Sequence, residues 1–409
     1  MSAHAVRYAP AGKRFLTPGV VVLVGLMGIA AAISLWRFIF GLSSVTNLND
    51  QYPWGIWIGI DVASGVALAA GGFTTAALAH IFHRKHYEAI LRPALLTAML
   101  GYTFVGLALM VDLGRYYNIW HPAWPTMWQG NSVLFEVGMC VMAYLTVLYL
   151  EFLPIVCERF IGRVNLPGPL AGLNAPADRL LRFADKTVGK IMFLLVIAGV
   201  VLSCMHQSSL GTLMVIAPYK VHALWYTPIM PLLFLLSAIS VGYPMVVVES
   251  MLASRSYGRK PEMEILTPLS RFVVFFLGIY IVAKITDLLV RGAQPLLLEG
   301  SFESNMFLVE MGLGALLPLG MLLTERVRRS PGLLFTACGL VVLGVIINRV
   351  NVFVVAYNPP YSTGRYVPSI YEILVTVGMI AALAFVYRVA VTIFPVLPAE
   401  ESATSHGAR

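Results

Sequence analysis

The stretch PGVVVLVGLMGIAAAISLWRFIF, residues 18–40, contains one charged side chain, Arg37, and is otherwise almost entirely apolar. A helix needs about 20 predominantly apolar residues to cross the hydrocarbon core of a bilayer. Lys13 and Arg14 precede the stretch directly, and no small-residue cleavage pattern follows. The stretch therefore predicts a membrane-spanning helix that is retained, rather than a cleaved signal peptide.

Further stretches of this kind recur along the 409 residues. The expected spans are 18–40, 54–82, 94–112, 131–153, 190–206, 228–250, 270–291, 303–324, 332–354 and 370–394; rejecting the short fifth one would leave nine. Only 12% of the residues are charged and the mean hydropathy is +0.80, whereas soluble domains carry about 25% charged residues. The composition predicts an all-α integral membrane protein with about ten transmembrane helices. Its net charge of +8 does not by itself indicate a nucleic-acid partner.

Lys and Arg are distributed unevenly between the two sets of loops. The segments 1–17, 83–93, 154–190, 251–271 and 324–331 and the C-terminal end carry 21 of them, whereas the opposite set carries Arg37, Arg115, Lys220, Arg291 and Arg365. Basic loops remain in the cytoplasm, so we expect both termini, 1–17 and 395–409, on that side.

Two of the expected spans open with similar sequences. The fourth opens with NSVLFEVG, residues 131–138, and the eighth with NMFLVEMG, residues 305–312, so that Asn, Leu, Glu and Gly coincide. The spans before them also correspond, because Asp112 ends one and Asp287 ends the other. Chance likeness between apolar helices is the alternative. The pattern favours two related four-helix bundles, spans 2–5 (54–206) and 6–9 (228–354), with the helices 18–40 and 370–394 flanking them.

The loops on the predicted outer side have a distinct composition. Segments 113–130, 207–227 and 355–369 are rich in Tyr, Trp and Pro and carry little charge. An aromatic belt at the membrane surface explains part of this pattern. The other interpretation is a structured cap that docks another protein outside the membrane.

Charged residues inside spans are functional candidates, because an unpaired charge at bilayer depth costs several kcal/mol. The candidates are Asp61, Asp112, Glu136, Glu151, Glu249, Lys284, Asp287, Glu310, Arg349 and Glu372. We expect Glu151, Glu249 and Glu372 to lie near span ends and to snorkel. The deeper residues Asp61, Glu136, Lys284, Glu310 and Arg349 indicate a hydrated polar route. Pairing of Lys284 with Asp287, or of Arg349 with Glu310, is the structural alternative.

The first bundle gathers polar groups toward its outer face. Trp54 and Asp61 lie near the start of the second span, Asp112, Arg115 and Tyr116 close the third, Asn131 and Glu136 open the fourth, and His206-Gln207-Ser208-Ser209 ends the fifth. Convergent polar groups in an apolar pocket can hold a quinone and supply its protons. We expect His206, Asp112, Glu136 and Asp61 to exchange those protons and Trp54, Arg115, Tyr116, Asn131 and Gln207 to line the pocket. Taken alone, a histidine on an apolar helix is more often structural.

The sequence provides no obvious site for a haem or a metal. Of the eight histidines, only His80 and His206 fall within expected spans, and they lie at opposite ends. Membrane b-type haems need facing histidines. The four cysteines, at positions 140, 157, 204 and 338, are widely separated and form no CxxC motif. We expect neither a haem, an iron–sulfur cluster nor a metal in this chain.

Several stretches together resemble a known family. They are Pro53–Trp57 with Asp61, Arg92–Leu96, Asp112–Tyr116, Asn131–Glu136, Met205–Gly211, Tyr219–His222 and Asn358-Pro-Pro with Pro368-Ser369, and they extend over about residues 40–394. The chain resembles the NrfD/PsrC family, and within it the HybB-like branch of ten-helix subunits. The likeness is close in the first bundle and looser in the second.

The resemblance implies a subunit of the bacterial inner membrane that has no redox cofactor of its own. Such a subunit exchanges electrons between menaquinone and a periplasmic ferredoxin-like partner with [4Fe-4S] clusters, beside catalytic or cytochrome c subunits of a hydrogenase or sulfate-respiration complex. On the matching positions, His206, Asp112, Glu136 and Asp61 would serve quinone and protons. Lys284, Glu310 and Arg349 would carry protons in the second bundle.

A secondary transporter is the rival interpretation, since repeats and buried charges also suit a transport path. Transporters usually contain helices broken at mid-membrane in both halves. Here Pro244 and Pro318 are expected to interrupt spans 6 and 8, and nothing comparable appears in spans 2–5. A structural anchor without a quinone site is the third possibility.

Overall fold

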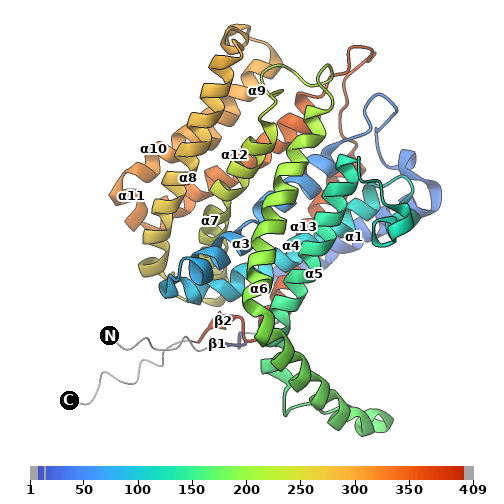
Figure 1. The fold of residues 1–409 in the computed structure, drawn as a ribbon, viewed down its shortest axis with the longest axis vertical. Coiled ribbons are helices and arrows are strands. Elements are labelled where there is room, and N and C mark those ends of the chain that lie inside the picture. Colours follow the sequence, from blue (N-terminus) through green and yellow to red (C-terminus); the bar gives the residue numbers. More distant parts are fainter. Residues whose placement is uncertain (1–7, 13–14, 400–409) are drawn as a thin grey trace.

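The computed structural model describes residues 8–12 and 15–399 (Figure 1). The remaining parts of the expected cytoplasmic N-terminus and tail, 1–7, 13–14 and 400–409, lie outside the described residues. Within the described part, ten helical segments are long and apolar enough to cross a membrane. The predicted all-α membrane class is therefore confirmed.

The ten spans consist of continuous and composite helices. The continuous ones are α1 (Pro18–Phe40), α4 (Leu91–Asp112), α5 (Val133–Phe160), α6 (Asn174–Val215), α7 (Met230–Tyr257), α8 (Met263–Val290) and α13 (Ile370–Ile393). The second span joins the π-helix η2 (Trp57–Ser64), α2 (Gly65–Leu68), α3 (Gly71–Ala76) and the π-helix η3 (Ala77–Ile81). The eighth joins α9 (Phe302–Met311), η10 (Gly312–Leu316) and α10 (Leu317–Leu323), and the ninth joins α12 (Pro331–Val350) and η11 (Asn351–Val355).

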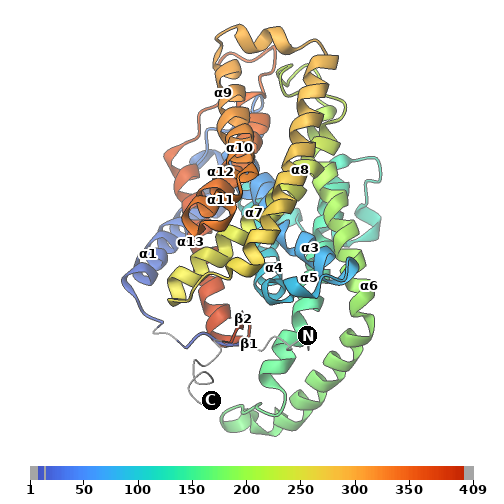
Figure 2. The same ribbon diagram turned by 90° about the vertical axis from the view of Figure 1, so that its left-hand side faces the viewer.

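Helix α7 lies at the centre of the assembly and contacts α6, α8, α12, α2 and α3 (Figure 2). By contrast, α1 packs mainly against α13, and most of its apolar side chains remain exposed to the surroundings. This agrees with the expectation that the first and last spans flank the others. The division into two four-helix bundles remains a prediction.

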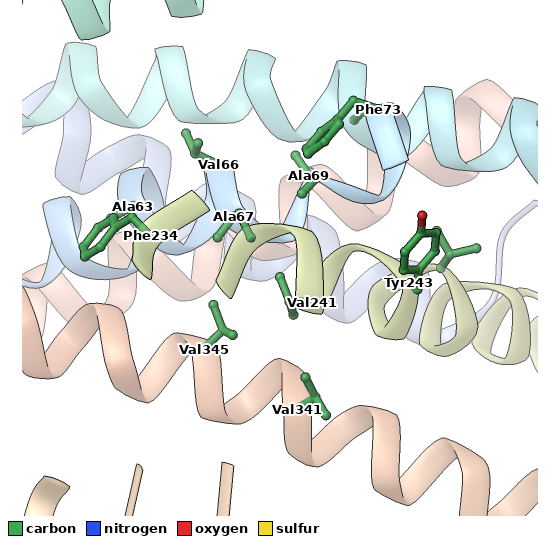
Figure 3. Packing of buried hydrophobic residues seen from close by; sticks show 14 of the residues in the cluster. Ala63, Val66, Ala67, Ala69, Phe73, Phe234, Val241, Tyr243, Val341 and Val345 are labelled. Carbon is green, nitrogen blue, oxygen red and sulfur yellow. The ribbon is translucent and has the colours of Figure 1, made fainter. Parts of the chain in front are cut away.

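Small side chains allow the second span to approach its neighbours closely. Helix α7 presents Phe234 and Val241 to this span, where they lie beside Ala63, Val66, Ala67 and Ala69 (Figure 3). On the opposite side of α7 lie Val341 and Val345 of α12 (Figure 3). These residues are buried, and with no water in the bilayer to drive burial, close packing supplies much of the attraction between spans. The second span is therefore the most enclosed of the ten.

The second span is broken near its middle, between α2 and α3. The Ala70 amide donates to the Ala67 carbonyl at 3.2 Å instead of continuing the i→i−4 pattern. The expectation that no such interruption occurs in spans 2–5 is therefore wrong. Pro244, which was expected to interrupt the sixth span, lies within the continuous helix α7. The break follows from consecutive small residues whose chain path is set by tertiary contacts rather than by proline.

The fifth span extends well beyond the expected range 190–206. Helix α6 contains 42 residues, about 63 Å at 1.5 Å per residue, whereas the hydrocarbon core is about 30 Å thick. The polar run at 206–209 does not end the span, because its side chains have partners between helices and the helix continues to Val215. The N-terminal half of α6 protrudes from the other helices together with the C-terminal end of α5 (Figure 1).

The two described terminal segments meet at one end of the molecule. Strand β1 (Tyr8–Ala9) pairs antiparallel with β2 (Leu397–Pro398). Guanidinium groups hold this ribbon, because Arg92 donates to the Pro395 carbonyl at 2.9 Å and Arg259 to the Pro398 carbonyl at 2.6 Å. We call this end, with the protruding α5–α6 hairpin, the inner end, and the opposite one the outer end.

Candidate functional site

His206 lies in the interior of the molecule, on α6, with no exposed surface. Its Nε2 atom forms a hydrogen bond with the hydroxyl of Tyr102 on α4, and its Nδ1 atom lies 2.7 Å from the Leu202 carbonyl oxygen. A carbonyl only accepts, so Nδ1 carries a proton, and Nε2 of the neutral ring accepts from the Tyr102 hydroxyl. The Tyr144 ring of α5 lies 4.7 Å from the Tyr102 ring and 5.5 Å from the imidazole.

This cluster of Tyr102, Tyr144 and His206 lies deeper than the sequence indicated. Tyr102 occupies the middle of α4, ten residues and about 15 Å from its outer end at Asp112. His206 was expected to close the fifth span at the outer face, but nine further residues of α6 follow it. The imidazole is therefore a mid-span group, and a ligand at the outer surface would not touch it directly.

Gln207 connects α6 with the break in the second span. Its Nε2 atom donates to the carbonyl oxygen of Val66 at 2.8 Å. In an unbroken helix that carbonyl would accept the Ala70 amide, which here is bonded to Ala67. The side chain of Gln207 thus replaces a backbone bond that the break removes.

Glu136 and Ser209 form a second polar pair, nearer the outer end. The Ser209 hydroxyl lies 2.6 Å from a carboxylate oxygen of Glu136 and donates to it. Glu136 lies in the first turn of α5, near the outer end of its span, and is exposed rather than enclosed between helices. Because Ser209 is one helical turn from His206, the exposed carboxylate and the buried cluster are neighbours along α6.

The other residues expected to line the pocket are dispersed. The Trp54 ring centroid lies 6.0 Å from that of Phe353 and 6.1 Å from that of Tyr357. Trp54 thus packs against the outer end of the ninth span. Tyr116 packs against Phe38 of α1 at 4.7 Å. Arg115 and Asn131 are exposed at the outer end. The structure therefore does not gather all of these side chains around one point.

Asp61 and Asp112 belong to a third polar group, which faces α13. Asp61 accepts a hydrogen bond from Thr376 of α13 at 2.7 Å. Asp112 is buried near Arg37, not paired with Arg115, and its Oδ1 atom has no hydrogen-bond partner among the described residues.

Glu372 of α13 completes this group. Its carboxylate accepts hydrogen bonds from the Tyr366 hydroxyl, from the Ser369 amide at 2.7 Å and from the Asn47 amide at 3.2 Å. It has no exposed surface, so the expectation that it snorkels to the surface is wrong. The capping bond to Ser369 explains why a carboxylate is stable at this helix start.

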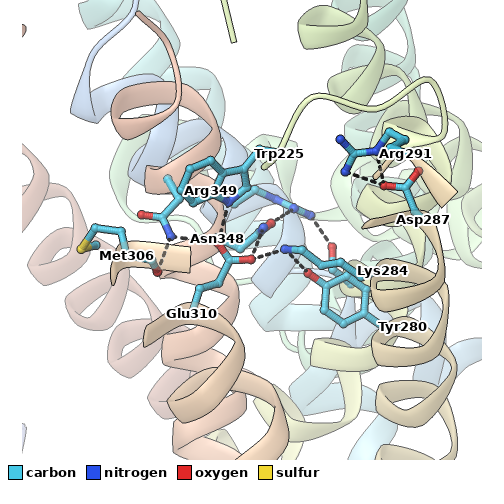
Figure 4. Close-up of polar contacts among 11 residues, drawn as sticks. Trp225, Tyr280, Lys284, Asp287, Arg291, Met306, Glu310, Asn348 and Arg349 are labelled. Atoms are coloured by element: carbon cyan, nitrogen blue, oxygen red, sulfur yellow. Dashed lines mark hydrogen bonds and ion pairs between the residues drawn. The ribbon is translucent and has the colours of Figure 1, made fainter. Parts of the chain in front are cut away.

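Glu310 is the centre of the polar network in the second half of the chain (Figure 4). It is paired with Lys284 of α8, and it accepts hydrogen bonds at 2.8 Å from each of Trp225, Asn348 and Asn351. Four donors satisfy both carboxylate oxygens, as a buried ionised carboxylate requires. As in the Glu136–Ser209 pair, two of the donors, Asn348 and Asn351, come from the span that follows, which supports the predicted repeat.

The charge pairs differ from those weighed at the sequence level. Asp287 is paired with Arg291 at 2.8 Å rather than with Lys284. Arg349 does not bridge to Glu310; it donates to Asn348 at 2.7 Å and to Ser237 at 2.8 Å, and its guanidinium lies 3.7 Å from the Phe234 ring centroid. Lys284 and Arg349 thus place two buried cations beside one carboxylate.

Several contributors were missed from the sequence. These are Tyr102, Tyr144, Thr376, Trp225, Asn348 and Asn351. Single tyrosines and threonines inside apolar spans are common, and only their facing partners distinguish these residues. Asn348 and Asn351 could have been noticed, since two amides flank Arg349 at helical spacing.

Curated proteins of similar sequence include named subunits of redox enzymes. The chain is 33% identical to the "Probable Ni/Fe-hydrogenase 2 b-type cytochrome subunit" of Escherichia coli (strain K12), with 95% of each chain covered. It is 27% identical to the "Menaquinone reductase, integral membrane subunit" of Nitratidesulfovibrio vulgaris, over 87% of this chain and 86% of that one. A selenate reductase subunit of Mesobacillus selenatarsenatis is 24% identical over 91% and 93%.

The first of these names mentions a b-type cytochrome, and the described residues do not fit such a haem. Both ring nitrogens of His206 are engaged, one by Tyr102 and one by Leu202. A bis-histidine site needs a second imidazole across the bundle. The His80 side chain lies in η3, toward the inner end of the second span, and the described part of the chain holds no cluster of three metal-ligating side chains.

The sequence profile of one family, described as "Polysulphide reductase, NrfD", matches residues 44–359. The match includes the second to ninth spans, and with them the His206, Glu136 and Glu310 groups. The relatives above cover nearly the whole chain at up to 33% identity. The chain therefore belongs to the NrfD family of membrane subunits of respiratory oxidoreductase complexes.

Proposed function

We propose that this chain is the quinone-reactive subunit of such a complex and exchanges electrons between a periplasmic [4Fe-4S] partner and menaquinone. The carrying observation is the exposed carboxylate of Glu136, which is hydrogen-bonded to Ser209 one turn from the buried His206. A quinone diffusing in the membrane can reach an exposed group. The bound quinone then needs hydrogen-bond partners for its carbonyl oxygens and a supply of protons from the interior of the protein.

The proposed site combines a contact group with a proton reserve. Glu136 and Ser209 would meet the quinone oxygen, and the Tyr102–His206 pair would pass protons toward them. Menaquinone is favoured because one relative is named as part of a menaquinone reductase. Asp61 and Asp112, which face α13, would belong to a separate polar route rather than to the first contact.

The proposed partners and orientation follow from the exposed aromatic loop at the outer end and the basic loops at the inner end. The loop after α4 exposes Trp120, Trp124 and Trp128 at the outer end, and a wide apolar surface of this kind suits a docked protein. The ferredoxin-like [4Fe-4S] partner would dock there, with catalytic or cytochrome c subunits beyond it. The positive charge of the inner loops supports a position of both termini on the cytoplasmic side of a bacterial inner membrane.

In the second half, proton transfer would involve Lys284 and Glu310. A lysine can lose its proton, whereas a guanidinium remains charged, so Arg349 would act as a fixed cation. A cavity of about 20 Å³ beside Lys284, lined also by Asp287 and Arg291, has room for one water molecule. We propose that reduction or oxidation of the quinone is coupled to proton translocation through this network.

The break in the second span removes one sequence argument against a secondary transporter. The relatives nevertheless carry the names of hydrogenase, menaquinone reductase and selenate reductase subunits. These names favour a redox role over transport.

The test is purification of the chain with its bound subunits, followed by optical spectra, quinone extraction and turnover with a menaquinone analogue. We expect extractable quinone and iron–sulfur absorption, without b-type haem bands from this chain.

Glu136→Gln should lower quinone turnover by about 100-fold, which is the usual effect of losing an acid–base group. Glu325→Gln, an exposed inner-end carboxylate paired with Arg329 at 2.5 Å, is the control. Unchanged turnover in Glu136→Gln would show that Glu136 does not take part in the reaction with quinone and would refute the proposed site.

A further inference from the structure

The α5–α6 interface carries a continuous polar stripe from the outer toward the inner end. Glu136, Tyr144 and Glu151 follow one another along α5 at intervals of eight and seven residues, about 12 and 10.5 Å. On α6, Ser209, His206 and Ser203 face them, with Gly199 beyond. The first two levels are the proposed quinone contact and the histidine cluster. The third, at Glu151, has no assigned role.

Glu151 is not the surface carboxylate that its place in the sequence indicated. It lies nine residues before the end of α5, and its relative exposure is only 9%. No ion pair joins it to a cation among the described residues. Burial of a carboxyl group without a cation is costly unless the group can hold a proton. Its position in the inner half of the helix therefore indicates a proton-exchanging role.

Gly199 brings Glu151 and Tyr144 to the same point. A Cβ atom at position 199 would lie 3.3 Å from a carboxylate oxygen of Glu151 and 3.5 Å from the Tyr144 ring. A methyl group here would make ordinary contact with the ring and would require the carboxylate to shift by a few tenths of an ångström. The carboxyl group is thus adjacent to the Tyr144 ring, which in turn packs against His206.

Three polar atoms without a hydrogen-bond partner belong to residues around this point and His206. The hydroxyls of Tyr144 and Ser203 and the side-chain carbonyl oxygen of Gln207 are buried without a hydrogen-bond partner among the described residues. Each of these residues is at most 1% exposed. Buried polar atoms of this kind are normally bonded by ordered water, and such water conducts protons between side chains.

We infer that Glu151 is the inner-end proton donor and acceptor for the His206 cluster. The inference rests on the proposed quinone function and adds the side and route of its protons. Reduction of a quinone to a quinol takes two electrons from the iron–sulfur partner and two protons. Each proton passes from Glu151 through water at Tyr144 and Ser203 to the Tyr102–His206 pair, then to Glu136 and the quinone oxygen.

This route separates charge across the membrane. Electrons enter from the outer partner, whereas protons are taken up at the inner end, where Glu151 is replenished from water. The relay itself undergoes no net oxidation, since each group returns to its starting protonation state. Running in reverse, quinol oxidation would release protons through the same residues.

The test uses the intact complex in lipid vesicles, with a menaquinone analogue, a voltage-sensitive dye and a pH dye on the inner-end side. Glu151→Gln should lower turnover and inner-side proton uptake together by at least tenfold. Glu151→Asp should retain most of the rate, and a small weak acid such as formic acid should restore part of the rate in Glu151→Gln. The control is Glu158→Gln, one carboxylate further along α5 and half-exposed beside Arg92.

A second pair of variants guards against a folding defect. Gly199→Ala keeps the carboxyl group but inserts a methyl group between Glu151 and Tyr144, and it should slow turnover about threefold or more. Gly189→Ala on the same helix meets no atom within 4 Å and should behave like the unmodified chain.

The outcomes separate the two proposals. If the unmodified complex does not react with quinone, the proposed function fails, and this inference with it. If the unmodified complex reacts and Glu151→Gln retains its rate and inner-side proton uptake within twofold, the inference alone is overturned. A loss in Glu151→Gln that neither Asp nor formic acid relieves also overturns it, because only a structural role would remain.

Discussion

Lys284 of α8 is paired with Glu310 of α9, across two spans, rather than with Asp287 on its own helix. Both partners are buried, and three further donors hold the carboxylate in place. Asp287 is instead paired with Arg291, one turn closer to the outer end. The pairing joins the two titratable groups that the proposed proton transfer would use, and amides and a guanidinium surround them.

Replacing Lys284 with Met should strongly destabilise the chain. The substitution leaves Glu310 as a buried carboxylate without its cation, and breaking such a pair costs about 3–5 kcal/mol. Thermal unfolding in detergent should show a lowered midpoint. The double variant Lys284→Met with Glu310→Gln should recover most of the loss, because no unpaired charge remains. Equal loss in the single and double variants would mean that the pair itself contributes little.

Glu262 gives a pH-dependent prediction outside the spans. Burial raises the pKa of this carboxyl group, against the opposing charge of Arg259. The folded chain therefore binds a proton more tightly than the unfolded chain, and stability falls as the pH rises from the ordinary carboxyl range through the raised pKa. Glu262→Gln should raise the unfolding midpoint at neutral pH and have little effect at acidic pH. Glu264→Gln, an exposed neighbour, is the control. A gain that is the same at both pH values would contradict this account.

The ten spans could be predicted because hydropathy acts over a whole segment and does not depend on which way a side chain points. The membrane class followed from this hydropathy, whereas the family followed from short motifs. The eighth span, expected at 303–324, occupies Phe302–Leu323. Membership of the NrfD family, inferred from the motif around residues 131–136 and 205–211, is confirmed by the profile match.

The partners of those residues could not be predicted, because they depend on helix rotation and depth. His206 was expected at an outer pocket with Asp112, but α6 continues past it and the imidazole faces Tyr102. Asp61 was expected to join the same pocket, but its span is turned toward Thr376 of α13. A polar run in sequence marks a span end only when its side chains lack partners inside the bundle.

A glycine pair marks the closest approach of the eighth and ninth spans. A Cβ atom at Gly314 would overlap the Cα atom of Gly344, and the reverse is also true. Because the obstacle is backbone, Gly314→Ala must push the two helices apart, and we expect a cost of at least about 1–3 kcal/mol. Gly320→Ala, in the same span with no atom within 4 Å, should be neutral in the same thermal unfolding assay. Equal midpoints for the two variants would show that the spans separate freely.

Gln207 provides the last prediction, which separates a structural role from quinone contact. Its amide donates to the Val66 carbonyl that the break in the second span leaves without the Ala70 amide. Gln207→Leu keeps similar volume but leaves that buried carbonyl unsatisfied, which costs about 1–3 kcal/mol. We expect a lowered unfolding midpoint with the affinity for a menaquinone analogue retained. Thr212→Val, which loses only a 3.4 Å bond to a carbonyl of its own helix, is the control. If Gln207→Leu instead leaves the midpoint unchanged and weakens quinone binding, Gln207 touches the quinone and the break is held by other contacts.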